Sequence, residues 1–472
     1  MPLAWVDEIS GVEPAINFLQ GNGYTSQIWP HEGVEKQFLA YLPLQGWLHI
    51  LTQYILGFSI YMVRFPYAIY LLLGALFLYK ALKKTNINTL VSLFIIILVL
   101  NEKSLFETTR GIRVEPITFL LLSISVYGFS TKKIYIVTLA SSLMIVLHPY
   151  VWPAAGVFLF ACFYFWNKTT KHPVLRFIKP NILWLMPVSI LVFFLFFIHF
   201  DIELLYSQFV NQAERHTSFG GISSRFYNHF IRRFWPYYIT QPYVPLLVYF
   251  ALGYSIYKAV KMEWNPAVIA ILLTHVVWFA ILGPMHRYDS VLVFLSLFAV
   301  LPLLSSIRLP QQKIIYTLVA LLLFGISCVD VASRQLMATV QKTERSPEKF
   351  LTWLNTNIDK NPSIISGHEI AYYAAVPNDN IDFFLFNTTP YRFDFDTYQN
   401  LYLISEKTWP NHEVVSKYAV QNTVSWDWIK NSGTHTYKSL YLLKAKSVQD
   451  YNHALRKMKS ANTAERSKFT YQ

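Results

Sequence analysis

A series of long apolar runs separated by short charged segments dominates this chain and limits what it can fold into. A helix that crosses a bilayer needs about 20 mostly apolar residues, and fewer where flanking side chains reach the interface. Only 14% of the residues are charged, against about 25% in a typical soluble domain. The sequence therefore predicts a mainly helical, polytopic membrane domain. The candidate spans are 65–82, 88–101, 112–129, 134–148, 150–166, 181–199, 242–260, 266–283, 289–307 and 313–330.

The stretch 40–63 is also apolar, but proline, glycine and polar residues interrupt it. We expect it to form an amphipathic helix at the membrane interface rather than a span. The chain carries a net charge of +13. Its basic residues lie in short runs between apolar segments, which argues against a nucleic-acid partner and for loops at a membrane surface.

Lysine and arginine in short loops set the expected orientation. The loops 81–84, 130–133, 167–179, 257–261 and 307–313 are basic and lack acids, so we expect them in the cytoplasm. The alternate segments then face outward, and they mix arginine with aspartate, glutamate and histidine: 1–64, 101–111, 148–149, 200–241 and 283–289. Mixed ionisable residues at a membrane surface are more typical of a functional site than of a topology signal.

Residues 334–472 differ from the rest because the long apolar runs stop. The segment SPEKFLTWL (346–354) has a serine cap, a proline in the first turn and apolar residues at helical spacing. The segment PSIISGHEIAYYA (362–374) indicates a strand, a glycine turn and a helix. We predict two domains: a transmembrane domain over 1–333, with outward loops 1–64 and 200–241, and a small α/β domain over 334–472 on the outer side.

Several motifs on the predicted outward side occur in a recognisable order. They are WVDEI (5–9), FLQGNGYTS (18–26), FLAYLPLQGWL (38–48), GFSIYMVRF (57–65), TTRGIRVEPITFLLLSISVY (108–127), HPYVWPAAGVFLF (148–160) and HRYDSVLVFLSLFAVLPLL (286–304). Together they resemble the GT-C class of integral-membrane glycosyltransferases, in the branch that includes protein O-mannosyltransferase-like and lipid A aminoarabinose transferase-like enzymes. The resemblance spans most of residues 5–330.

The chain departs from that family at its start. The family has a transmembrane helix before the acidic pair, where this sequence has only MPLAWV. The charge pattern puts both ends outside with about ten spans, and an added first helix would restore a cytoplasmic N-terminus. We therefore expect about 10–11 spans, counting a first helix that either precedes the given sequence or has been lost, and the charge pattern favours the former.

The resemblance implies transfer of a sugar from a polyprenyl-phosphate-linked donor to a glycan, lipid or protein acceptor. It makes Asp7 the general base, a contribution of about 10²–10⁴-fold, with Glu8 placing the acceptor or a metal. The alternative is that the two acids only favour a helix start electrostatically. A divalent ion (Mg²⁺, Mn²⁺ or Zn²⁺) could take part, but the sequence leaves the cofactor unknown.

The resemblance also implies roles for the later motifs. Arginine suits phosphate oxygens, so Arg110, Arg113 and Arg287 are candidates for binding the donor phosphate. Glu115, His148 and His286 are candidates for contacting the acceptor or a metal. The alternatives are interfacial arginines whose stems lie along the apolar surface and a histidine that merely precedes a proline at a helix start.

The segment 199–241 is longer than an ordinary connection. Its stretch FYNHFIRRFWPYY (226–238) predicts an amphipathic helix on the membrane surface, either a lid over the donor or a helix attracted to anionic lipid.

We therefore expect a transferase in the bacterial inner membrane, with its active site and C-terminal domain extracytoplasmic. A transporter or flippase for lipid-linked saccharides, a polysaccharide polymerase and an inactive scaffold are the alternatives. A transporter would predict repeat symmetry and broken helix pairs, which the sequence does not show.

Overall fold

The computed structural model divides the chain into two compact units. The helical unit comprises Leu39–Ile55 and Val63–Val331, and the sheet unit comprises Met1–Phe38, Leu56–Met62 and Ala332–Gln472. The division near residue 332 lies close to the predicted domain boundary, but the two N-terminal segments group with the C-terminal residues. The structure describes residues 6–26, 37–39, 41–105, 112–169, 173–216, 221–238, 240–281, 288–306, 346–359, 361–367, 371–377, 380–384, 395–405, 407–419 and 439–457, with single residues between 325 and 342.

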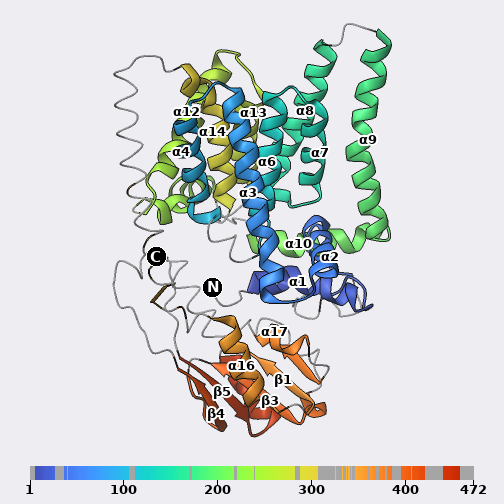
Figure 1. Cartoon of the computed structure of the whole chain (residues 1–472), viewed down its shortest axis with the longest axis vertical. Helices are drawn as coiled ribbons and strands as arrows, with labels where there is room; N and C mark the ends of the chain where they lie inside the picture. Colours follow the sequence, from blue (N-terminus) through green and yellow to red (C-terminus); the bar gives the residue numbers. More distant parts are fainter. Residues whose placement is uncertain are drawn as a thin grey trace. The chain divides into compact units, whose positions relative to one another are not determined.

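A bundle of helices builds the helical unit, and Figure 1 shows α6, α7 and α8 side by side. The helices are α2 (Pro43–Leu56), α3 (Ile60–Lys84), α4 (Thr89–Leu100), α6 (Glu115–Ser130), α7 (Ile134–Ile145), α8 (Trp152–Thr169), α9 (Pro173–Phe197), α10 (Ile202–His216), α12 (Tyr243–Val260), α13 (Pro266–Ile281) and α14 (Asp289–Ser306). Each predicted span from 65–82 to 289–307 overlaps one of these helices. The predicted span 313–330 lies outside the described residues, apart from residue 325.

Two of the described helices, α3 and α12, are long and apolar enough to cross a membrane. A third span results if Leu183–Phe197 and Ile202–Gln208, which are bent by 91°, are counted as one. The other apolar helices in the described part of the chain have 10–17 residues. Large apolar side chains stay exposed on both groups of helices, including Leu72 of α3 (70%) and Phe160 of α8 (71%). Apolar surface of this kind is expected where helices face lipid, and it supports an integral membrane protein.

Close helix packing depends on small residues at two contacts. A Cβ atom on Gly74 of α3 would lie 2.6 Å from the ring of Phe119 on α6. A Cβ atom on Gly128 of α6 would lie 2.6 Å from the side chain of Val137 on α7. Glycine lets the helix backbones approach at these points, as is common between membrane helices.

The segment before α12 is helical over 222–237, but it is not one regular α-helix. It consists of α11 (Ile222–Phe226), a π-helical turn η2 (Tyr227–Ile231) and a 3₁₀-helix η3 (Arg232–Tyr237). His229 and Arg233 are buried, although Trp235 stays 65% exposed. The segment buries polar groups against the other helices, and such contacts override the simple surface periodicity. π-helical turns of this kind are rare and often lie at functional sites.

The sheet unit contains the predicted small α/β domain. Its elements are α1 (Val6–Leu19), α16 (Pro347–Asn357), β1 (Ser363–Ser366), α17 (Tyr372–Ala375), β2 (Ile381–Phe384), η7 (Phe395–Thr397), β3 (Asn400–Ser405), β4 (His412–Tyr418) and β5 (Leu440–Ala445). The strands form one sheet in the order β2-β1-β3-β5-β4. β1 is parallel to β2 and β3, whereas β5 is antiparallel to β3 and β4. Buried Ile364, Leu403 and Leu443 belong to its core.

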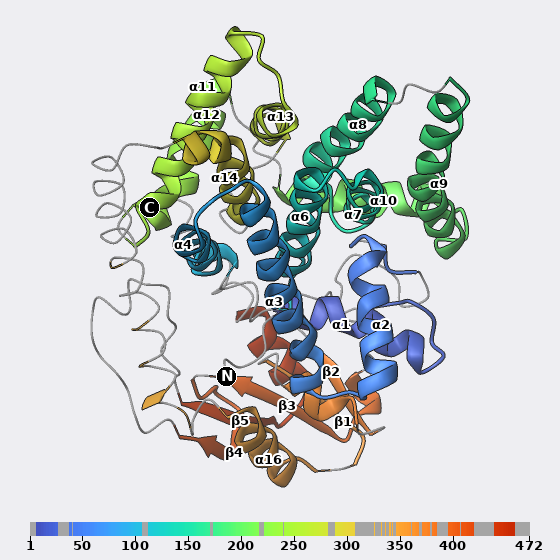
Figure 2. The same cartoon turned by 45° about the horizontal axis from the view of Figure 1, so that its top comes forward.

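The helix predicted from SPEKFLTWL is α16, and its start follows the sequence pattern. The Ser346 hydroxyl accepts a hydrogen bond from the Lys349 backbone N–H, and Pro347 lies in the first turn. Phe350 and Leu354 are fully buried. The Trp353 indole donates to the Ser416 hydroxyl of β4 at 2.9 Å, so α16 lies against the sheet, as Figure 2 shows.

Candidate functional site

The starts of three helical segments in the helical unit come together around Arg113, Glu115, His148, Tyr150 and Tyr288, here called the aromatic–arginine cluster. Arg113 and Glu115 lie at the start of α6. His148 and Tyr150 lie at the short 3₁₀-helix η1 (Pro149–Val151) before α8, and Tyr288 directly precedes α14. Three helix starts that the sequence predicts to face outward thus lie together in the structure.

Arg113 and Glu115 form a largely buried ion pair. The Arg113 Nε atom lies 3.2 Å from one Glu115 carboxylate oxygen and 3.4 Å from the other. The Glu115 side chain has no exposed surface, and the Arg113 side chain is 12% exposed. Glu115 also lies in the first turn of α6, where the helix dipole favours a negative charge. The carboxylate therefore sets the orientation of the guanidinium group.

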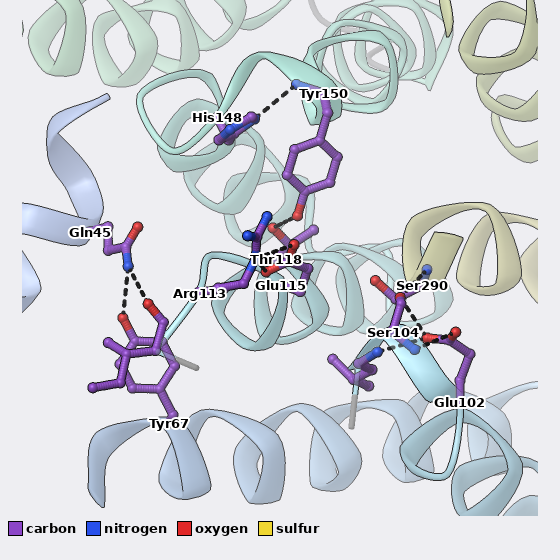
Figure 3. A network of polar contacts seen from close by, with 12 residues as sticks. Gln45, Tyr67, Glu102, Ser104, Arg113, Glu115, Thr118, His148, Tyr150 and Ser290 are labelled. Atoms are coloured by element: carbon purple, nitrogen blue, oxygen red, sulfur yellow. Dashed lines mark hydrogen bonds and ion pairs between the residues drawn. The ribbon is translucent and has the colours of Figure 1, made fainter. Parts of the chain in front are cut away.

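The backbone before Arg113 is held in an unusual conformation. Ile112 has a φ of 50°, which a β-branched residue rarely adopts. Its carbonyl accepts a hydrogen bond from the Gln45 amide at 2.8 Å, and the same amide nitrogen donates to the Tyr67 hydroxyl at 3.1 Å. Figure 3 shows Gln45 and Tyr67 beside this segment. Backbone strain of this kind persists only where surrounding contacts enforce it.

His49, which also lies on α2, contacts the same tyrosine, Tyr67. One of its ring nitrogens, Nε2, lies 2.9 Å from the Tyr67 hydroxyl. Burial lowers the pKa of His49 from 6.5 to about 3, because the charged form loses its hydration. The imidazole is therefore neutral at physiological pH.

Two tyrosines form the centre of the cluster. The rings of Tyr150 and Tyr288 stack with centroids 4.3 Å apart and an interplanar angle of 15°. The Tyr150 hydroxyl lies 2.7 Å from the Thr118 hydroxyl on α6. The His148 ring packs on both tyrosines at 4.7 and 5.4 Å, and the Arg113 guanidinium lies 5.9 Å from the Tyr288 ring centroid. Figure 3 shows His148 and Tyr150 together with Arg113 and Glu115.

His148 also starts the helix that follows it. Its Nδ1 atom accepts a hydrogen bond from the Tyr150 backbone N–H at 3.4 Å. A neutral imidazole whose Nδ1 accepts carries its proton on Nε2. His148 therefore has a local structural role at η1 as well as its contacts with the two tyrosines.

A second ion pair, which the sequence did not predict, lies deeper in the helical unit. The Arg233 Nε atom lies 2.6 Å from an Asp289 carboxylate oxygen, and neither side chain has exposed surface. Asp289 is the first residue of α14, directly after Tyr288. The Arg233 guanidinium lies 4.5 Å from the Trp278 ring centroid, and the Trp278 indole donates to the Tyr150 carbonyl at 3.0 Å. The two ion pairs therefore flank the same group of aromatic rings.

Two histidines extend this second pair. Arg233 Nη1 lies 3.2 Å from His229 Nδ1, and His229 Nε2 lies 3.0 Å from His275 Nδ1. Because arginine only donates hydrogen bonds, His229 Nδ1 accepts and its proton is on Nε2. Burial, together with the nearby Arg233 and His275, lowers the pKa of His229 from 6.5 to about 2. In the sequence, the four-residue spacing of His229 and Arg233 indicates that both lie on one face of a helix. It does not indicate that Asp289 is the partner of Arg233.

Glu102 is also buried, and it caps a helical turn. Its carboxylate accepts hydrogen bonds from the Ser104 and Leu105 backbone N–H groups and from the Ser104 and Tyr237 hydroxyls, at 2.7–2.9 Å. Burial raises the pKa of Glu102, and these hydrogen bonds oppose the shift. The Ser104 hydroxyl also accepts from the Ser290 backbone N–H at 3.1 Å, which connects Glu102 to the start of α14.

The predicted acidic pair lies in the sheet unit, at the start of α1. Asp7 is in the first turn of this helix, but its side chain is outside the described part. Glu8 is completely buried, and its carboxylate accepts a hydrogen bond from the Tyr373 hydroxyl of α17 at 2.7 Å. The sequence placed Glu8 near the acceptor or a metal, and the structure adds a partner from the C-terminal domain.

Three predicted site residues, Arg110, His286 and Arg287, lie outside the described residues. Within the part of the chain that the structure describes, no three histidine, cysteine, aspartate or glutamate side chains gather as metal ligands would.

Comparison with known proteins gives similarity at the level of structure. No protein-family model matches the sequence, and no curated protein matches it. The structures of ArnT from Cupriavidus metallidurans, in the apo state and bound to undecaprenyl phosphate, each match with a TM-score of 0.51. They are 9% and 10% identical in sequence, and each match covers 94% of this chain and 94% of that chain. The resemblance predicted from the motifs, to the branch of lipid A aminoarabinose transferases, is confirmed for the fold: this chain is folded like ArnT.

Proposed function

We propose that this protein is a membrane glycosyltransferase that moves a sugar from a polyprenyl-phosphate-linked donor to an acceptor outside the cytoplasm. The observation that carries the proposal is the aromatic–arginine cluster, which unites three helix starts in a chain folded like ArnT. The ArnT structure with undecaprenyl phosphate shows that a protein of this fold binds a polyprenyl phosphate.

The proposed reaction is a single displacement at the anomeric carbon of the sugar. The bond from this carbon to the phosphate oxygen breaks, and a bond to the acceptor oxygen forms. The acceptor proton passes to a carboxylate, for which we propose Asp7. The phosphate keeps the electron pair of the broken bond, so the reaction increases its negative charge.

Arg113 is the described residue best suited to that charge. Its guanidinium is always protonated and its planar geometry fits phosphate oxygens. The contact with Glu115 is through Nε, so Glu115 acts by orienting the guanidinium. Because the pair is largely buried, its electrostatic interactions are screened less than those of surface charges. Because of their sequence motifs, we also propose Arg110 and Arg287 as further phosphate ligands. For the same reason, we propose that His148 and His286 contact the acceptor or a metal.

The experiment is sugar transfer from polyprenyl-phosphate-linked donors in membranes that contain the full chain or its Asp7→Asn variant at equal abundance. We expect transfer by the unchanged chain and a loss of about 10²–10⁴-fold in the variant. Equal transfer by both would exclude Asp7 as the base. Movement of the donor across the bilayer without transfer would favour a transporter. Chelation followed by addition of Mg²⁺, Mn²⁺ or Zn²⁺ would show whether a metal takes part.

A further inference from the structure

A buried hydrogen bond connects the C-terminal domain to the start of α1. The Tyr373 hydroxyl donates to the Glu8 carboxylate at 2.7 Å. Glu8 has no exposed surface, and Tyr373 is 5% exposed. Both residues belong to the sheet unit, although they lie near opposite ends of the chain. A hydrogen bond to a buried carboxylate is costly to lose, because the charge then has one donor fewer and cannot reach water.

Aromatic packing holds Tyr373 in place. Its ring stacks on Phe58 with centroids 5.3 Å apart and an interplanar angle of 8°. Phe58 also packs edge-on against Tyr372 at 6.4 Å. Tyr372 packs in turn against Phe383 of β2 at 5.8 Å. The short helix α17 is therefore fixed to the sheet and to the segment before α3, and it presents a rigid hydroxyl to α1.

Two further hydrogen bonds hold α1 nearer to its C-terminal end. The Ser26 hydroxyl donates to the Glu13 carboxylate at 2.5 Å, and the Asn17 amide donates to the Thr25 carbonyl at 2.9 Å. These bonds connect α1 to its own following loop. The Tyr373–Glu8 bond differs because it ties the first turn of the helix, next to Asp7, to the C-terminal domain.

We propose that Tyr373 is a positioning residue: through Glu8 it anchors the first turn of α1 and so places Asp7 for proton removal. This inference rests on the proposed function of Asp7. It assigns Glu8 to anchoring rather than to the acceptor or a metal, and it gives the C-terminal domain a defined part in catalysis.

The test uses the full chain and four variants: Tyr373→Phe, Glu8→Ala, Glu8→Gln and the double variant Tyr373→Phe/Glu8→Ala. We expect Tyr373→Phe and Glu8→Ala each to lower kcat by about tenfold or more, with little change in the KM for the donor. The decrease in kcat of the double variant should be no larger than that of the more impaired single variant, because both changes remove the same hydrogen bond. The decrease in kcat should be smaller in Glu8→Gln than in Glu8→Ala, because the amide oxygen of glutamine can still accept a hydrogen bond from the Tyr373 hydroxyl.

The matched control is Tyr441→Phe, which removes the hydroxyl of a tyrosine on β5 of the same sheet. The described side-chain contacts of Tyr441, with Lys417 and with the core of the sheet, use its ring, so we expect this variant to keep the activity of the unchanged chain. A readout independent of activity is amide hydrogen exchange of α1. It should rise in Tyr373→Phe and stay unchanged in Tyr441→Phe.

Two results would overturn the inference. One is a Tyr373→Phe variant with unchanged kcat and unchanged exchange of α1. The other is a Glu8→Gln variant as inactive as Glu8→Ala while Tyr373→Phe is fully active, which would make Glu8 a chemical group. Failure of the proposed function has a separate signature: no transfer by the unchanged chain, or no effect of Asp7→Asn. The exchange measurement would still decide whether the anchor exists.

Discussion

Arg113 and Glu115 lie two residues apart in the chain and form an ion pair at the start of α6, with Arg113 Nε 3.2 Å from the carboxylate. The pair adjoins Tyr288, whose ring lies 5.9 Å from the guanidinium. In the proposed mechanism Glu115 orients the cation and Arg113 meets the leaving phosphate. The two residues should therefore respond differently to substitution.

Glu115→Gln should lower kcat/KM for the donor. The change removes a charge-assisted contact of about 1.5–3 kcal/mol, which corresponds to roughly 10–100-fold in rate if the orientation of Arg113 is lost. The measurement is initial transfer rate against donor concentration, with protein abundance matched.

The control for this prediction is Glu263→Gln, which breaks the exposed contact between Lys258 and Glu263. Exposed pairs contribute about 0–1 kcal/mol, so this variant should behave like the unchanged chain. A Glu115→Gln variant with full activity would show that Arg113 needs no help from Glu115.

The buried pair of Arg233 and Asp289 should matter for stability. Asp289→Ala leaves the Arg233 charge buried without its carboxylate, a change that typically costs about 3–5 kcal/mol. The unfolding temperature of Asp289→Ala in detergent should be clearly lower than that of the unchanged chain. Replacing both residues together, as Arg233→Met with Asp289→Leu, should restore part of the loss because no unpaired charge remains. A double variant less stable than Asp289→Ala would contradict this account.

Gly74 and Gly253 form a matched pair of sites for helix packing. Gly74→Ala places a Cβ atom 2.6 Å from the Phe119 ring, and Phe119 is buried against Phe294 with ring centroids 6.0 Å apart. We expect a loss of about 1–3 kcal/mol, because the ring has little room to move. Gly253→Ala meets nothing within 4 Å and should be neutral or stabilising by up to about 1 kcal/mol. Comparison of the two unfolding temperatures tests this directly.

Stability should decrease in acid through His49. Its pKa falls from 6.5 to about 3 on burial, so the unfolded chain binds a proton that the folded chain does not. Stability through this group is fully present above pH 6.5 and is lost as the pH falls from 6.5 towards 3, by up to about 1.4 kcal/mol per pH unit. Unfolding temperature measured across this range should fall less steeply in His49→Gln, and an identical slope would contradict the assignment.

Much of the secondary structure could be predicted because its causes are local. The predicted spans 65–82 and 242–260 correspond to α3 and α12, since length and composition alone decide whether a helix can bury its polar backbone in lipid. The cap of α16 followed from Ser346 and Pro347, which act within one turn. The helical character of 226–238 was also predictable. Its π and 3₁₀ turns and the burial of His229 and Arg233 were not, because they depend on the helices around them.

Some members of the aromatic–arginine cluster were predictable, but the contacts between them were not. The sequence singled out Arg113, Glu115 and His148 by residue type and by position at helix starts. It could not show that His148 packs on Tyr288 or that Arg233 pairs with Asp289, because such contacts join residues far apart in the chain and leave no local periodicity.

The sequence by itself determined that this protein has apolar helices of membrane length, a small C-terminal α/β domain and an acidic pair near its start. Those properties follow from hydrophobicity, capping and helix propensity, which act over one or a few turns. Only the tertiary structure decided which partner each buried charge has. The partner of Glu8 is Tyr373, because a buried carboxylate needs a donor and the folded chain brings that hydroxyl to it.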